Sequence, residues 1–287
     1  MAWTKETLKA YHKHWVEFNE FSEKIDRKPL PASIDQIALY VTYIRQKKSL
    51  KATTIQSRLT AISHHHLMAG YNSPTHGYIV KSLITAYGNN DAPPATRRSI
   101  TRDILADIIL SINHTETGYK KRLYVAILCL MYHGLLRCSE VTHSSKCNHN
   151  LRASQVVLKK EPLIKIDFLS YKHSKPNPAP LYVKATQNST CPVRALRRFK
   201  KVRPASSSTM FCHENRRPIS RGQLVEVVRS HLDMCGRNSC EFNTHSLRMG
   251  KATDMLREGF TDRQIAVAGR WSSSAFLKYI KPNLVVV

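Results

Sequence analysis

The sequence predicts a mainly α-helical protein with one small antiparallel β-sheet, an α+β fold in two domains. Three observations predict this fold. Apolar residues recur with a period near 3.6 over most of the chain, strand-like patterns are confined to residues 152–186, and a polar stretch with consecutive prolines divides the chain near residue 93. A length of 287 residues is comfortable for two domains, and a hydrophobic content of 42% can supply a core for each.

The charge indicates the class of partner. The chain has 45 Lys and Arg residues against 20 Asp and Glu, a formal net charge of +25. Such a surplus favours a polyanionic partner, most often nucleic acid, and a merely solvated basic surface is the alternative. No run approaches the roughly 18 apolar residues of a membrane span, and the N-terminus lacks a signal-peptide pattern. We therefore expect no membrane partner.

Seven cysteines at irregular spacing are typical of reduced thiols in an intracellular protein. One group invites a metal interpretation, but its spacing matches no standard zinc module. The group is Cys138, His143, Cys147 and His149. We expect no metal there, and we expect the triplet His64–His66 to be the polar end of a helix.

Residues 1–92 are expected to form a helical domain. Thr4 can cap the first helix, Ser33 or Asp35 the second, and Gly70 can end the third. No strand pattern lies between the periodic segments. These segments cover about 4–23, 33–44, 54–69 and 78–87.

Residues 93–98 are expected to be a linker. Pro93 and Pro94 interrupt any helix, and Arg97 and Arg98 stand beside them as expected contacts to DNA phosphates. A hinge between two basic domains would let them close on opposite sides of a duplex.

Residues 99–287 are expected to form a second domain that contains the sheet. A helix from about 121 to 133 is apolar nearly all round, so we expect it to be central. Three short strands are expected at 155–158, 163–168 and 180–183, with a polar hairpin tip at 170–178. The other expected helices are 102–111, 193–201, 220–235, 244–258, 262–268 and a short one that contains Tyr279.

Basic residues crowd the helix at 193–201. They form a face suited to the phosphates of a nucleic-acid backbone. The residues are Arg194, Arg197, Arg198, Lys200 and Lys201.

Two arginines stand where a phosphate could be bound. Arg137 directly follows the apolar central helix, where an unpaired cation would be costly, so it meets either an external anion or Glu140 three residues on. His245 and Arg248 are three residues apart, so on a helix they project from one face. Thr244 stands where the N-cap of that helix belongs, and a helix start favours anions.

These residues resemble the signature of the tyrosine recombinase, or phage-integrase, family. The ordered set is Arg137, Lys172 or Lys175, His245, Arg248, Trp271 and Tyr279. Local context matches as well, in the stretches 134–140, 245–250 and 269–280. The wording G-R-W-S-S-x-x-F-x-x-Y-I is most similar to eukaryotic mobile elements of the Crypton and DIRS types, which would imply a nuclear location.

The resemblance implies a SAM-like core-binding domain at 1–92 and a catalytic domain at 99–287, which close on DNA as a C-shaped clamp. It also implies roles. Tyr279 would attack the phosphodiester to give a 3′-phosphotyrosyl intermediate, Arg137 and Arg248 would bind the non-bridging oxygens, His245 would act as the base, and Lys175 would protonate the leaving oxygen.

The remaining site residues have supporting roles by the same resemblance. Trp271 would donate its indole N–H to the phosphate, with plain core packing as the alternative. Glu140 would support Arg137 or His245, Lys172 is the second candidate for the acid, and Arg270 is an expected DNA contact.

A recombinase of this kind implies double-stranded DNA as partner, a dimer on each site and a tetramer in synapsis, without metal or ATP. The activity would serve DNA integration, excision or transposition. The alternatives are a catalytically silent DNA-binding protein derived from such an element, and a topoisomerase IB-like enzyme.

Overall fold

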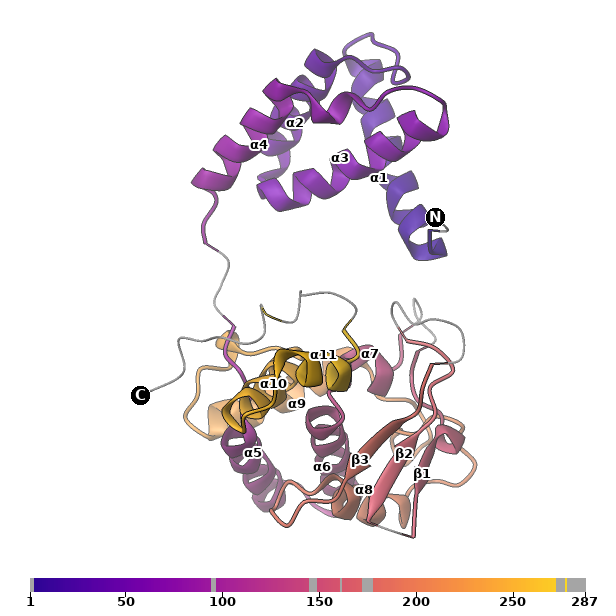
Figure 1. The fold of residues 1–287 in the computed structure, drawn as a ribbon, viewed down its shortest axis with the longest axis vertical. Helices are drawn as coiled ribbons and strands as arrows, with labels where there is room; N and C mark the ends of the chain where they lie inside the picture. The colour runs from indigo at the N-terminus through magenta and orange to yellow at the C-terminus, as the bar shows by residue number, and fades with distance from the viewer. Residues whose placement is uncertain are drawn as a thin grey trace. The chain divides into compact units, whose positions relative to one another are not determined.

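The computed structural model describes residues 3–93, 97–144, 149–160, 162–171, 178–271 and 277. The chain divides into two compact units, Met1–Pro94 and Ala95–Val287 (Figure 1). The predicted fold class is confirmed: both units are built of helices, and the second contains a small antiparallel sheet.

The first unit contains the four helices that the periodicity predicts. They are α1 (Lys5–Lys24), α2 (Ile34–Lys48), α3 (Ala52–Met68) and α4 (Tyr78–Asn90), with a 3-10 turn η1 at Pro74–His76. Thr4 caps α1 by accepting a hydrogen bond from the Thr7 amide, and Ser33 caps α2 in the same way from Gln36. Fully buried Phe18, Tyr40 and other apolar side chains form the core of this unit.

The histidine triplet is partly inside this core, which differs from the polar helix end that we expected. His66 is fully buried, and its Nε2 accepts a hydrogen bond of 2.9 Å from the Ala32 amide. Burial lowers the pKa of His66, which keeps the ring in the neutral form that can accept this bond. The ring of His65 stacks on Trp15. The triplet therefore joins α3 to α1 and to the segment before α2.

The second unit packs its helices and sheet around one large core. Its helices are α5 (Arg102–Thr115), α6 (Gly118–His133), α7 (Cys138–Val141), α8 (Pro192–Lys200), α9 (Arg221–Met234), α10 (Ser246–Arg257) and α11 (Asp262–Gly269), with 3-10 turns η2 (Ala153–Gln155) and η3 (Ser239–Glu241). The three predicted strands are confirmed as β1 (Val156–Leu158), β2 (Leu163–Ile166) and β3 (Leu181–Lys184). They pair antiparallel in the order β1-β2-β3, with Val156 opposite Ile166 and Ile164 opposite Val183.

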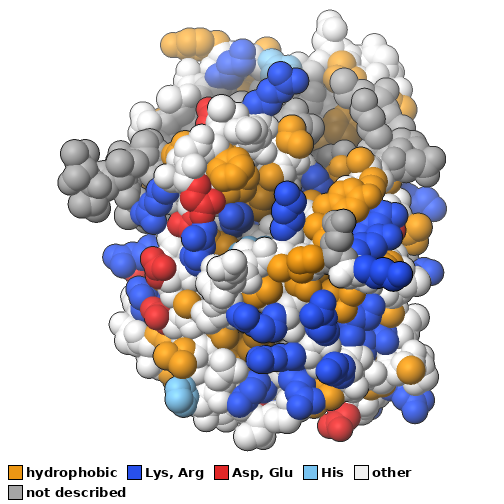
Figure 2. All heavy atoms as spheres, turned by 60° about the horizontal axis from the view of Figure 1, so that its bottom comes forward, with side chains coloured by type: hydrophobic (Ala, Val, Ile, Leu, Met, Phe, Trp, Pro, Cys, Tyr) orange, Lys and Arg blue, Asp and Glu red, His pale blue; other side chains and the backbone are white. Residues whose placement is uncertain are grey.

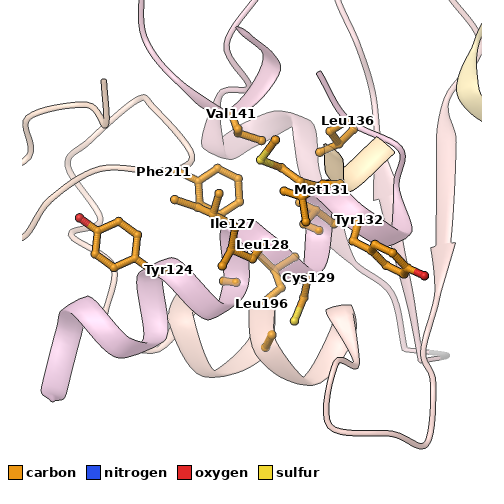
Figure 3. Close-up of a cluster of buried hydrophobic side chains, with 14 of the residues drawn as sticks. Tyr124, Ile127, Leu128, Cys129, Met131, Tyr132, Leu136, Val141, Leu196 and Phe211 are labelled. Atoms are coloured by element: carbon orange, nitrogen blue, oxygen red, sulfur yellow. The ribbon is translucent and has the colours of Figure 1, made fainter. Parts of the chain in front are cut away.

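Helix α6 is the centre of this core, as its all-round apolar sequence predicts. Seven consecutive residues of α6, from Ala126 to Tyr132, are fully buried. Figure 3 shows Leu136 and Val141, from beyond the end of α6, packed in the same cluster as Leu196 of α8 and Phe211. The position of the chain after α6 is thus fixed by the core itself.

The start of α10 differs from the prediction. The helix begins at Ser246 with His245 as its N-cap, and Thr244 is buried before it. Asn243 and Ser246 cap the turn instead: the Asn243 amide donates to Ser246 Oγ at 2.9 Å, and the His245 amide donates to Asn243 Oδ1 at 2.8 Å. The sequence offered several capping side chains in a row, and only tertiary packing selects among them.

Glycine at 250 sets how closely α10 approaches the start of the unit. A Cβ at Gly250 would lie 1.6 Å from the carbonyl oxygen of Ile100. The Ile100 amide in turn donates to the Ser246 carbonyl at 2.9 Å, and the Arg98 amide donates to the Glu241 carbonyl at 2.8 Å. The segment 97–100 is therefore held against α10 and η3.

Within the described ranges, no helix combines the length and the apolar character needed to cross a bilayer. The six cysteines in these ranges are all free thiols, and Cys147 lies outside them.

Candidate active site

The predicted site residues that the structure describes meet at one end of the second unit. Arg137 is the N-cap of α7, His245 and Arg248 stand at the start of α10, and Trp271 follows α11. Figure 1 shows α7, α10 and α11 together at this end. Tyr279, Lys172 and Lys175 lie outside the described residues.

Glu140 is a buried carboxylate that serves two arginines. It is 0% exposed, and its Oε2 accepts from the Arg137 amide at 2.9 Å. Its Oε1 lies 3.3 Å from Arg137 Nη1, which is the ion pair that the sequence offered as an alternative. Arg270 binds the same carboxylate from the other side, at 2.9 Å through Nη2 and 3.3 Å through Nη1. Glu140 therefore orients Arg137 and ties it to the end of α11.

Arg270 belongs to the interior of this site. Its side chain is 9% exposed, and its guanidinium lies 4.3 Å from the ring centre of Phe168 and 5.0 Å from that of Tyr171. Its backbone is left-handed, with φ of 55°, which turns the chain out of α11. We expected Arg270 to contact DNA; in this structure its side chain is instead used to hold Glu140.

The main-chain carbonyl of Leu135 connects Arg248 to Arg270. It accepts hydrogen bonds from Arg248 Nη1 at 2.7 Å and from Arg270 Nη2 at 3.3 Å. Leu135 has a φ of 47°, a left-handed conformation that costs a non-glycine residue about 1–2 kcal/mol. Because Leu136 is anchored in the core, the strained turn is what aims this carbonyl at the two guanidinium groups.

Arg248 and Trp271 pack against each other in the same site. Arg248 is only 2% exposed, and its Nη2 donates to the Gly269 carbonyl at 2.9 Å. Its guanidinium lies 4.7 Å from the centre of the Trp271 ring. A Cβ at Gly269 would be 1.9 Å from that ring, so the ring lies directly on the glycine. Trp271 also packs against a cluster that includes Leu135 and Ile265, so the packing role is present.

Together these contacts form one connected chain from Arg137 through Glu140, Arg270 and the Leu135 carbonyl to Arg248. The chain contains three guanidinium groups and one carboxylate. Guanidinium groups that are held in a fixed orientation bind oxyanions through charge-assisted hydrogen bonds. The geometry therefore favours an anionic ligand at this end of the unit.

His245 stands at the N-terminus of α10. Its side chain is exposed, and as the N-cap of α10 it lies beside the amide groups at the positive end of the helix dipole. An imidazole in this position can exchange a proton with a ligand that Arg248, three residues on, helps to hold.

The remaining predicted residues lie elsewhere. Arg97 donates to the Cys240 carbonyl at 2.7 Å and Arg98 pairs with Glu241 at 2.9 Å, so both are attached to η3. Lys200 donates to the Val156 carbonyl at 2.8 Å and is thus directed at β1. The other predicted cations of α8, which are Arg194, Arg197, Arg198 and Lys201, are exposed at the opposite end of the unit.

A metal site does not form among the described residues, since they contain no group of three or more His, Cys, Asp and Glu side chains that could hold an ion. Cys147 of the group considered from the sequence lies outside those residues.

Comparison with known proteins identifies the family. The model of the phage integrase family matches residues 100–281, which is more than half of the chain. This chain belongs to the phage integrase family. The "Integrase/recombinase xerD homolog" of Selenomonas ruminantium is 26% identical over 271 residues, which cover 86% of this chain and 72% of that protein.

Two solved structures of integrases share the fold. The Tn1549 transposon integrase, in complex with transposon right end DNA, has a TM-score of 0.67 and 14% identity, covering 97% of this chain and 90% of its own. A lambda integrase dimer bound to a COC' core site has a TM-score of 0.63 and 14% identity, covering 98% and 90%. At these identities the similarity to the two integrases is evidence of a shared fold only.

Sequence reasoning did not predict the contributions of Leu135 and Arg270 to this integrase site. Leu135 contributes only its main-chain carbonyl, which no side-chain pattern reports. For Arg270 a signal existed: a buried glutamate needs compensating cations, and Arg137 at the surface end of a helix is a single one. Glu140, seven residues after the buried helix α6, could thus have prompted a search for a second arginine.

The buried pair between Arg270 and Glu140 should matter far more for stability than a shorter but exposed pair. We expect Arg270→Met to lower the free energy of unfolding of the second unit by about 3 kcal/mol, because it leaves the buried carboxylate with one cation fewer. Chemical denaturation measures this change.

Arg237→Met is the matched control. Arg237 pairs with Asp107 at 2.8 Å, with side chains that are 36% and 48% exposed. An exposed pair contributes about 0–1 kcal/mol. Equal losses in the two variants would show that the pair with Glu140 is not the special one.

Proposed function

We propose that this protein is a tyrosine-type DNA strand transferase that cleaves and rejoins DNA in site-specific recombination. The observation that carries the proposal is the connected chain of contacts that holds Arg137 and Arg248 in one site. Membership of the phage integrase family over residues 100–281 supports it, as does the net charge of +25. The named relatives are integrases and recombinases, two of them bound to DNA.

The first chemical step would be attack on a phosphodiester. The Tyr279 hydroxyl forms the new Tyr–P bond, the bond from phosphorus to the 5′-oxygen breaks, and the phenol proton passes to His245. Arg137 and Arg248 would bind the two non-bridging oxygens, where charge accumulates in the transition state. The phenol has a reference pKa near 10, so it needs this base and these cations at neutral pH.

The leaving 5′-oxygen takes up a proton, for which Lys175 is the proposed donor and Lys172 the second candidate. The resulting 3′-phosphotyrosyl bond conserves the energy of the phosphodiester. Attack by the 5′-hydroxyl of a partner strand reverses the step. Neither ATP nor a metal ion is required by this scheme. Trp271, which stacks on Arg248, would complete the phosphate site with its indole N–H.

We also propose how the protein assembles on DNA. The first unit would be the core-binding domain and the second the catalytic domain, closing on double-stranded DNA as a clamp, with a dimer on each site and a tetramer in synapsis. A lambda integrase is bound to its core site as a dimer. The finer assignment to Crypton- or DIRS-type elements, and the nuclear location that would follow, rest on the wording around Gly269–Tyr279 alone.

A catalytically silent DNA-binding protein is the second candidate. It shares the basic charge but needs no nucleophile or acid. The presence of every expected catalytic residue type in the motif order favours the enzyme. A covalent intermediate would separate the two.

Trapping that intermediate tests the nucleophile. A duplex selected from a random pool by repeated binding, and nicked next to the scissile phosphate, should give a covalent 3′-adduct on denaturing gels. Tyr279→Phe should abolish the adduct while retaining DNA binding. Identical products from both proteins would remove Tyr279 from the mechanism, and no adduct from either would favour the silent binder.

The proton donor can be identified by changing the leaving group. A 5′-thiolate leaves without protonation, so a 5′-phosphorothiolate substrate should restore cleavage to the variant that lacks the true acid. We expect rescue of Lys175→Ala to within about tenfold of wild type, from a deficit of about 10²–10⁴-fold on the normal substrate. Rescue of Lys172→Ala alone would transfer the role to Lys172.

A further inference from the structure

A basic cavity lies at the end of the second unit away from the arginine site. It has a volume of about 410 Å³ and lies between α5, α6 and α8. Five of its lining side chains are cationic: Lys121, Arg122, Arg194, Arg198 and Lys201. The lining includes no Asp or Glu, and within the described residues none of the five cations forms an ion pair.

The two sites are separated by the length of α6. Lys121 and Arg122 are the fourth and fifth residues of α6, near its N-terminus, while Arg137 comes four residues after its last residue, His133. Twelve residues at 1.5 Å each, from Arg122 to Gly134, amount to about 18 Å along the helix. Figure 1 likewise shows α8 at the end of the unit opposite α7 and α11. A straight duplex at the arginine site is therefore not the natural ligand of the cavity.

Basic side chains form a row along the α8 side of the cavity. Arg194, Arg198 and Lys201 follow at intervals of four and three, so they share one helix face over about 10 Å. The opposite face of α8 is anchored in the core through Leu196 and Phe199. Phosphates of one DNA strand follow each other every 3.4 Å along the axis, so the row matches about three of them.

Positive charge also extends beyond the cavity. This favours a polymeric anion over a small one as the ligand. Arg197, next to the row, is exposed and basic and does not line the cavity. Figure 2, in which the end of the unit with α8 comes forward, shows Lys and Arg side chains gathered over this face. A small polyphosphate would use only the hollow, whereas a nucleic-acid backbone would use the whole face.

We propose that this cavity and the row on α8 form a second binding site for the phosphate backbone of nucleic acid, which takes a DNA segment other than the one at the arginine site. The inference rests on the proposed function only in assigning the first duplex to that site. Each chain could then hold two DNA segments at once.

The test uses the full-length protein fixed on a bead-bound nicked duplex, followed by capture of a second, labelled duplex. Lys121→Glu/Arg122→Glu reverses two charges near the N-terminus of α6, where acidic residues interact favourably with the helix dipole, so folding should be retained. Arg217→Glu/Arg229→Glu changes the net charge equally at exposed positions outside the cavity.

We expect the cavity pair to weaken capture at least tenfold and the control pair by less than twofold. The slope of log K against log salt should fall by about 1.8 in the cavity pair, since each lost phosphate contact removes about 0.9. Equal weakening in both pairs, or unchanged capture in the cavity pair, would overturn the proposal. So would a wild type that binds inorganic triphosphate through these residues but captures no second duplex.

Adduct formation on the first duplex is scored on the same samples and tests the proposed function separately. If no adduct forms, capture is measured on protein bound non-covalently to the first duplex, and the comparison of the two pairs is unaffected.

Discussion

The hydrogen bonds that the carbonyl of Leu135 accepts from Arg248 and Arg270 are the contacts on which the arginine site depends. They require the left-handed turn between α6 and α7, and that turn is maintained because the residues on either side are buried in the core. A main-chain oxygen thus sets the position of two side chains from the last quarter of the sequence. Glu140 extends the arrangement to Arg137, so the large core of the second unit fixes the geometry of all three guanidinium groups.

The arrangement costs local strain and the burial of charge. A leucine in the left-handed region and charged groups removed from water are each unfavourable by themselves. Both become useful if a phosphate completes the site, because a guanidinium that is already oriented needs no reorganisation when charge develops. Tight glycines serve the same purpose: Gly250 lets α10 approach Ile100, and Gly269 lets Trp271 cover Arg248.

Sequence reasoning recovered the parts of this design that local physics determines. The periods of 3.6 and 2 predicted the described helices longer than a single turn and all three strands, because amphipathic burial dictates both. The apolar sequence of α6 predicted its central place. The motif order predicted that Arg137, His245, Arg248 and Trp271 belong to one site. The structure has all four at one end of the unit.

What sequence reasoning could not supply are contacts between segments far apart in the chain. The reversal of Arg270 from a DNA contact to a partner of Glu140 depends on a left-handed residue after α11 and on stacking against Phe168 and Tyr171. The start of α10 was misplaced because Asn243, Thr244 and Ser246 are all good capping residues. The basic face of α8 was predicted, but its separation from the arginine site becomes evident only when α6 is seen between them.

The most direct test of the account is a double-mutant cycle between Arg137→Ala and Arg270→Met, read out as single-turnover DNA cleavage well below the unfolding temperature. If Arg270 acts by holding Glu140 and thereby Arg137, Arg270→Met should slow cleavage about 10–100-fold in the wild-type background. It should slow cleavage by less than about threefold once Arg137 is absent, because the group that it positions is already gone. The same slowing in both backgrounds would contradict the account, since the two arginines would then act independently.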